Sequence, residues 1–144
     1  MNKTYTLDIV SAEEKIFSGA VRFAVFPGVD GELGVYPHHT PLLSMIREGT
    51  IKYQKENNDD FEILYVSGGI LEIQSNIVTV LADTAVRGAD LDEAKAEKAI
   101  ISAREKIKNQ GDKIDFAKAQ GELAEATAQM ETLRKIRKNK IAHN

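Results

Sequence analysis

The stretch Ile77-Val78-Thr79-Val80-Leu81 alternates apolar and smaller residues as a β-strand does, and Asp90-Leu91-Asp92-Glu93-Ala94-Lys95-Ala96 begins a helical pattern. The bridge between them, residues 82–89, is short and built mostly of small residues. Gly88 lacks a Cβ and adopts backbone angles that other residues resist, so we interpret Gly88-Ala89 as a hinge. The chain therefore changes architecture here, from strands to helices.

Upstream of this stretch, short alternating segments are separated by Gly, Pro and Asn. Tyr5, Leu7 and Ile9 alternate with Thr6 and Asp8, which predicts a strand with one buried face. Further strands are expected at 15–17, 21–26, 50–55, 61–66, 70–74 and 77–81, with the first two divided at Ser18-Gly19. Many short strands at regular spacing favour a sandwich or a flattened barrel.

Downstream, the chain is rich in Ala, Lys and Glu and contains no proline. Asp90 can cap a first helix, with Glu93 completing a capping box, and that helix should end near Asn109. Asp112 or Asp115 can cap a second helix. The apolar positions expected to form the seam between them are Ala96, Ile100, Ala103 and Ile107 on the first helix and Phe116, Ala119, Leu123, Ala126, Met130 and Leu133 on the second.

This seam consists largely of alanine, and each alanine buries little apolar area. A helical hairpin with such a seam is held weakly and could open. The alternative is that alanine simply lets the two helices pack closely and permanently, and the sequence leaves both readings open.

Composition excludes several classes of protein. The 144 residues suit about one domain, and the net charge of -3 gives no global attraction to nucleic acid or anionic lipid. The chain has no cysteine, which fits a reducing compartment such as the cytoplasm. No apolar run approaches the ~18 residues of a membrane span, so we expect no direct membrane insertion.

Catalytic motifs are missing as well: the sequence has no phosphate-binding GxxxxGK[ST] loop, no HExxH and no GxSxG. His38 and His39 are adjacent and would point to opposite faces of a strand, which disfavours a shared metal. Glu13-Glu14 and Asp59-Asp60 fall in predicted turns, where solvated carboxylates are the common case. We therefore expect no enzyme active site, no metal and no confident cofactor.

One turn-rich stretch stands out, Gly31-Glu32-Leu33-Gly34-Val35-Tyr36-Pro37-His38-His39-Thr40-Pro41-Leu42-Leu43. It is similar to the G-E-L-G-[IV]-x-P-x-H-x-P-L-L segment of the epsilon subunit of the bacterial F-type ATP synthase. The resemblance continues through residues 66–72, 78–85 and 87–94, in the same order, and covers essentially the whole chain.

The resemblance implies an α+β fold, a ten-stranded antiparallel β-sandwich in residues 1–86 followed by a two-helix antiparallel hairpin in residues 87–144. It implies a non-catalytic rotor subunit in the central stalk of a proton-translocating synthase, coupling the gamma subunit to the ring of c subunits. Such a subunit is peripheral, on the cytoplasmic face of the bacterial inner membrane.

The resemblance also assigns contact residues. Glu32 of the G-E-L-G turn and His39 correspond to family residues that face the c-ring, and Tyr36 is expected to join them. The family's usual glycine before that histidine is His38 here, so the local contact can differ. The alternative is that Glu32 and His39 are ordinary turn residues.

The hairpin is the moving part in the family, where it can extend along gamma among the alpha and beta subunits and suppress ATP hydrolysis. Such an arm needs a hinge and positive charge for an acidic target. The basic residues expected to serve the inhibitory tail are Arg104, Lys106, Lys108, Arg134, Lys135, Arg137, Lys138 and Lys140. A lysine-rich terminus that merely keeps the chain soluble is the alternative.

Some family members bind ATP through an [IL]-D-x-x-R-A motif, which corresponds to Leu91, Asp92, Lys95 and Ala96. Lys95 replaces the arginine and loses its planar fork, and Val86 stands where ATP-binding relatives have an acid. We expect this motif to be vestigial, with weak or absent ATP binding. The alternative function for the whole chain is a stand-alone nucleotide-binding or adaptor module.

Overall fold

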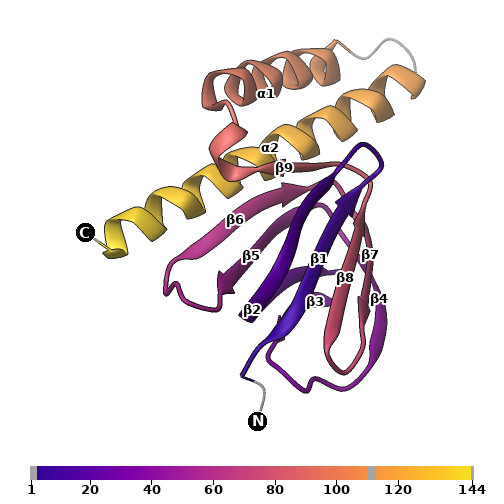
Figure 1. Ribbon diagram of the computed structural model, residues 1–144. Helices are drawn as coiled ribbons and strands as arrows, with labels where there is room; N and C mark the ends of the chain where they lie inside the picture. Colours follow the sequence, from indigo (N-terminus) through magenta and orange to yellow (C-terminus); the bar gives the residue numbers. More distant parts are fainter. Residues whose placement is uncertain (1–2, 110–112, 144) are drawn as a thin grey trace.

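The computed structural model describes residues 3–109 and 113–143 of the chain. In this part of the chain nine strands precede two helices (Figure 1). The strands are β1 (Tyr5–Ser11), β2 (Lys15–Gly28), β3 (Gly31–Val35), β4 (Leu42–Ile46), β5 (Gly49–Lys55), β6 (Phe61–Val66), β7 (Gly69–Ile73), β8 (Ile77–Ala82) and β9 (Ala85–Arg87). A 3-10 turn (Gly88–Asp90) leads to α1 (Glu93–Lys108) and α2 (Lys113–His143).

The strands form one sheet that folds back on itself. Its order is β1-β8-β7-β4-β2-β5-β6-β9, with β3 added to β2, and β1 also pairs with β2. Because β1 lies between β2 and β8, this end of the sheet is closed, as in a flattened barrel. The predicted β-sandwich with a helical hairpin is thus confirmed.

Two details of the sandwich differ from expectation. The described residues contain nine strands, not ten, and β1 pairs with β8 in parallel. In addition, the separately predicted strands 15–17 and 21–26 belong to a single strand, β2. Ser18 and Gly19 stay extended because they pair with Asp8 and Leu7 of β1, and the Ser18 hydroxyl donates to Asp8 Oδ1 at 2.5 Å.

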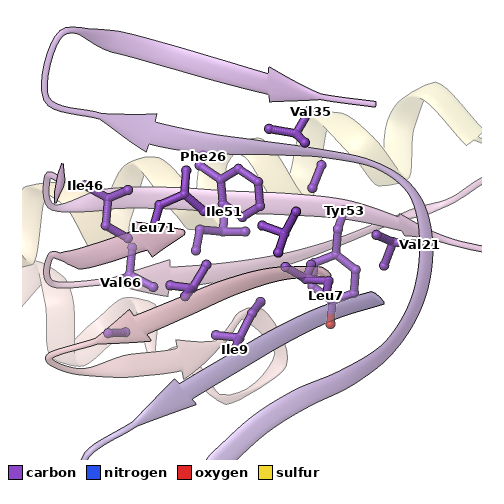
Figure 2. Packing of buried hydrophobic residues seen from close by; sticks show 14 of the residues in the cluster. Leu7, Ile9, Val21, Phe26, Val35, Ile46, Ile51, Tyr53, Val66 and Leu71 are labelled. Atoms are coloured by element: carbon purple, nitrogen blue, oxygen red, sulfur yellow. The ribbon is translucent and has the colours of Figure 1, made fainter. Parts of the chain in front are cut away.

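The core fills the space between the layers of the sandwich. Tyr5, Leu7 and Ile9 of β1 are buried as their alternation predicted, and they meet Phe26 and Leu71 from the opposite strands. Figure 2 shows the side chains of Leu7, Ile9, Phe26 and Leu71 pointing inward from strands far apart in the sequence. At about 25 cal/mol per Å², this continuous apolar core is the main stabilising feature of the domain.

The hairpin lies along one side of the sandwich. Helix α2 lies between α1 and the sheet and contacts β5 and β6 (Figure 1). The predicted alanine seam is confirmed, since Ala96 and Ala103 of α1 and Ala119 and Ala126 of α2 are buried.

The start of α1 corrects the predicted capping box. Asp92, not Asp90, is the N-cap, and its side chain accepts a hydrogen bond from the Lys95 backbone N–H at 3.1 Å. Asp90 instead belongs to the 3-10 turn that follows β9. For α2, Asp112 lies outside the described residues and Asp115 is already within the first turn.

Candidate functional site

An exposed apolar surface covers the outer side of β4, β7 and β8. Met45 pairs with Ile70, and Ile70 pairs with Leu81, so these three side chains form one row across the strands. Leu43 lies two residues from Met45 on the same side of β4. These four residues, here called the apolar face, are between 44% and 70% exposed.

The apolar face was not found from the sequence, although a signal was present. Leu81 lies in a strand that has apolar residues on both sides, and Leu43 and Met45 alternate with Ser44. In a single sheet, one of the two apolar sides must point outward. Contiguous exposed apolar surfaces on soluble domains commonly mark binding interfaces.

The structure places the predicted c-ring residues in three different settings. Glu32 lies in β3 with its carboxylate 3.9 Å from Lys135 Nζ of α2. The Tyr36 ring stacks on Phe23, with centroids 4.4 Å apart, and is 64% exposed. His39 Nδ1 lies 2.7 Å from the carbonyl oxygen of Thr40.

Glu32 and Tyr36 are four residues apart along one strand direction, which spans roughly 13 Å. No hydrogen bond or ion pair within the described residues joins Glu32, Tyr36 and His39 to one another. The substitution of His38 for glycine does have a structural effect, because His38 adopts φ 66°, a region that favours glycine. The role of these residues remains a prediction.

The basic residues of the tail are partly engaged within the hairpin. Lys106 lies 3.2 Å from Glu122, joining α1 to α2, and Arg137 pairs with Glu93. Arg104, Lys108, Arg134 and Lys138 are exposed, and the side chain of Lys140 lies outside the described residues. Exposed pairs of this kind contribute at most ~1 kcal/mol each, so they hold the hairpin together only weakly.

The interface between α2 and the sandwich contains a buried polar contact. Thr132 is buried in α2 and donates its hydroxyl proton to the Ala128 carbonyl at 3.0 Å. Thr50 of β5 lies 2.7 Å from the Thr132 hydroxyl oxygen. Since each hydroxyl has one proton, Thr50 must be the donor to Thr132.

A second polar contact lies beside this pair. The Tyr65 hydroxyl donates to Glu48 Oε2 at 3.2 Å. Burial raises the pKa of Glu48, the Tyr65 hydrogen bond lowers it, and the charge of Glu125 on α2 raises it further. Burial also raises the pKa of Tyr65, so this phenol stays protonated at neutral pH.

The predicted hinge glycine lies in a crowded place. Gly88 is buried, and a Cβ built there would come within 2.5 Å of Ile136 Cδ1 and 2.7 Å of the Ile63 carbonyl oxygen. The positive φ glycines of the described chain are Gly31, Gly68 and Gly69. Gly88 is therefore needed here for close packing against α2, and its role as a hinge stays a prediction.

The four residues predicted to form a vestigial ATP motif lie at the start of α1 and beside a cleft. Asp92 caps α1, and Ala96 is buried in the seam. Leu91, Asp92 and Lys95 line a cleft of about 670 Å³ between the helices. The same cleft is lined by the carboxylates of Asp90, Glu122 and Glu125, which with Asp92 outnumber the one lysine.

Residues 3–109 and 113–143 hold no cluster of three or more His, Cys, Asp or Glu side chains suited to a metal ion. Neither described helix is long and apolar enough to cross a membrane.

Comparison with known proteins covers both parts of the chain. Residues 4–88 match the family model for the ATP synthase delta/epsilon chain β-sandwich domain, and residues 89–134 match that for its long α-helix domain. The chain belongs to the ATP synthase delta/epsilon chain family. It is 54% identical over 140 residues to the ATP synthase epsilon chain of Nitrosomonas eutropha, covering 97% of this chain and 99% of that one.

Other relatives are similar in sequence or in fold. An ATP synthase epsilon chain of Delftia acidovorans is 51% identical over 137 residues, covering 95% of this chain and 99% of that one. Among solved structures, a chain of the Euglena gracilis mitochondrial ATP synthase OSCP/F1/c-ring assembly has a TM-score of 0.83 at 20% identity, covering 92% of this chain and 83% of that one. A chain of the Tetrahymena thermophila central stalk and c-ring has a TM-score of 0.64 at 11% identity, covering 92% and 97%. At these identities the two structures support the fold.

Proposed function

We propose that this chain is the non-catalytic epsilon subunit in the central stalk of a proton-translocating F-type ATP synthase. The observation that carries the proposal is its family membership over both domains, at about half identity to full-length relatives named ATP synthase epsilon chain. A stand-alone adaptor or nucleotide-binding module loses its support, because the match leaves no substantial part of the chain for another function.

The gamma subunit is the partner we propose for the apolar face. Leu43, Met45, Ile70 and Leu81 lie on strands that the hairpin does not cover (Figure 1). A flat apolar surface of this kind suits a stable contact with another rigid subunit of the rotor. The subunit then turns with gamma while nucleotides react elsewhere in the complex.

The c-ring is the partner we propose for Glu32, Tyr36 and His39. Tyr36 supports this role because its exposed ring is held in place by the stack on Phe23. Glu32 is available because its contact with Lys135 is long, at 3.9 Å, and its side chain is 60% exposed. Through these contacts the subunit lies peripherally on the cytoplasmic face of the bacterial inner membrane.

Residues 87–144 are proposed as a regulatory arm. The docked form in this structure has an alanine seam and exposed ion pairs, which together hold the helices less firmly than a Leu-rich seam would. When extended, its basic residues would meet acidic surfaces of the alpha and beta subunits and suppress ATP hydrolysis.

Binding to gamma tests the first assignment. Replacing Leu43 and Met45 together by Gln removes two apolar side chains from the proposed contact, each contributing about 1.5–3 kcal/mol when buried. We expect binding to the gamma-containing complex to weaken by about a hundredfold or more. Ile101→Gln is the matched control, since Ile101 is exposed at 59% on α1, away from the apolar face. Equal affinity of the double variant and the control would overturn the assignment.

Truncation after Ala89 tests the regulatory arm. The shortened chain keeps all nine described strands and loses the hairpin. In the assembled complex we expect faster ATP hydrolysis with proton coupling retained. Unchanged hydrolysis would make the hairpin a passive appendage.

A further inference from the structure

Strand β9 is short and lies at one edge of the sheet, immediately before the hairpin (Figure 1). It has three residues, and its pairing in the described sheet is with β6, where Arg87 lies opposite Leu64. So short an edge pairing opens easily by itself, because few backbone hydrogen bonds hold it. If β9 is to stay on the sandwich while the hairpin moves, side-chain contacts have to hold it there.

The Arg87 side chain provides such contacts. Its Nη2 donates a hydrogen bond to the Ile16 carbonyl oxygen at 2.9 Å, and its Nη1 lies 3.9 Å from Glu14 Oε1. Ile16 belongs to β2 and Glu14 to the segment just before it, so the guanidinium joins the last strand of the sandwich to the β1–β2 hairpin. The bond to Ile16 is the stronger of the two, because it is part-buried and its donor is charged, whereas the pair with Glu14 is long and exposed.

A β-bulge supplies the carbonyl group that Arg87 contacts. The register of β1 and β2 shifts between Ile9 and Val10 of β1, and Ile16 of β2 is the residue without a partner in that pairing. The extra residue of a bulge is left outside the hydrogen-bonded ladder. Ile16 is buried, and a buried carbonyl without a hydrogen bond is unfavourable. Arg87 satisfies this carbonyl, which ties β9 to a defined point of the sheet.

The contacts of the chain change directly after Arg87. Within the described residues, the polar contacts of Arg87 all go to the sandwich. The next residue, Gly88, already packs against α2, since a Cβ there would lie 2.5 Å from Ile136 Cδ1. Residues 88–92, here called the linker, form a 3-10 turn and two extended residues before α1 begins at Glu93. Such residues can absorb changes of φ and ψ, so undocking of the hairpin would break contacts of the linker and leave those of Arg87 intact.

We propose that Arg87 anchors β9 to the sandwich while the hairpin moves, so that the arm turns about the linker and not about β9. Arg87 is thus a positioning residue for the regulatory arm, a role that rests on the function proposed above. The anchor limits the tether of the arm to the linker, which spans at most roughly 18 Å. If β9 detached as well, the tether would lengthen by roughly 10 Å. A longer tether lowers the effective concentration of the arm at any one docking surface.

Hydrogen exchange of the isolated full-length chain, measured at increasing low concentrations of urea, tests the anchor. We expect the β9 amides that pair with β6 to exchange together with those of β6, and more slowly than the amides of α1, because the hairpin opens before the sandwich does. Arg87→Gln removes the charged donor. Exchange in β9 should then become about tenfold or more faster and follow that of α1, while β6 keeps its exchange rate.

Arg22→Gln is the matched control, because Arg22 makes the same two kinds of contact elsewhere. Its Nη2 donates to the Asn58 carbonyl oxygen at 3.1 Å and pairs with the Asp59 carboxylate at 2.8 Å. These contacts hold the turn between β5 and β6 and do not reach β9. The control should therefore leave exchange in β9 as it is in the unmodified chain.

Three outcomes would overturn the anchor. Exchange of β9 together with α1 in the unmodified chain would mean that β9 moves with the hairpin. Unchanged exchange of β9 in Arg87→Gln would mean that the side chain does not hold the strand, and equal acceleration of β6 and β9 would mean a general loss of stability. The measurement involves no other subunit, so its failure leaves the proposed place in the synthase untouched, whereas truncation after Ala89 tests the arm itself.

Discussion

Replacing Gly88 by alanine tests how the hairpin is held on the sandwich. The added Cβ would lie 2.5 Å from Ile136 Cδ1 and 2.7 Å from the Ile63 carbonyl oxygen, whereas ordinary contacts begin at 3.4 Å. The Ile63 carbonyl belongs to β6 and cannot yield, so α2 or the 3-10 turn must shift by about 1 Å. Overpacking of this size typically costs about 1–3 kcal/mol, which corresponds to a shift of roughly 5- to 150-fold toward the undocked hairpin.

Hydrogen exchange of residues 128–139 in the isolated chain measures this shift. We expect Gly88→Ala to speed exchange in this part of α2 and, in the assembled complex, to lower ATP hydrolysis by favouring the extended arm. Gly121→Ala is the matched control, because a Cβ at Gly121 meets nothing within 4 Å. In the control, helix propensity alone should stabilise α2 by about 1 kcal/mol. If Gly88→Ala leaves exchange in α2 unchanged, the close packing at Gly88 does not hold the hairpin, and our reasoning about the joint is wrong.

Three further predictions concern the same joint and the neighbouring cleft. Thr132→Val should destabilise the chain in urea by about 1–3 kcal/mol, because it leaves the buried Thr50 hydroxyl without its acceptor, and adding Thr50→Val should restore most of the loss. The pKa of Glu48 is raised in the folded protein, so its protonated carboxyl adds to the free energy of unfolding in acid. This contribution is lost as the pH rises from the ordinary pKa of 4.5 through the raised pKa. Glu48→Gln should therefore stabilise the chain at pH 8 relative to the unmodified protein, and a thermal melt that shows the same difference at pH 4 would contradict this. Calorimetry should find no ATP binding in the cleft beside Lys95, and micromolar affinity that is lost in Lys95→Gln would refute the assignment of that motif as vestigial.

Local sequence patterns predicted most of the architecture. Alternation placed Tyr5, Leu7 and Ile9 in the core, and the change of hydrophobic period after Leu81 located the transition from sandwich to hairpin. Both signals depend on residues close in sequence. The alanine seam followed in the same way, because a helix repeats its surface every 3.6 residues.

The predictions of local structure were wrong where contacts with residues far away in the sequence determine it. Ser18-Gly19 has the composition of a turn, yet pairing with β1 keeps it extended. Asp90 and Asp92 are both residues that favour the N-cap position. Asp92 is the N-cap because β9 and the 3-10 turn occupy residues 85–90.

The candidate functional sites were harder to predict from the sequence than the helices and strands. The contact between Glu32 and Lys135 joins residues about a hundred positions apart, and no local pattern announces it. The apolar face likewise depends on which strands become neighbours in the sheet. Spacing along one strand or helix is readable from the sequence, whereas the pairing of surfaces follows from the whole fold.

The position of β1 also bears on how the chain folds. Leu7 pairs with Val78, so the first strand of the protein is completed by one of the last strands of the sandwich. Contacts between residues so far apart close slowly, and folds dominated by them typically need milliseconds to seconds. On the ribosome, β1 can pair with β2 soon after that strand emerges, but its other edge stays unpaired until β8 has left the exit tunnel. The sandwich is therefore completed late, when most of its strands are already available, and the surface on which the hairpin docks is complete only then.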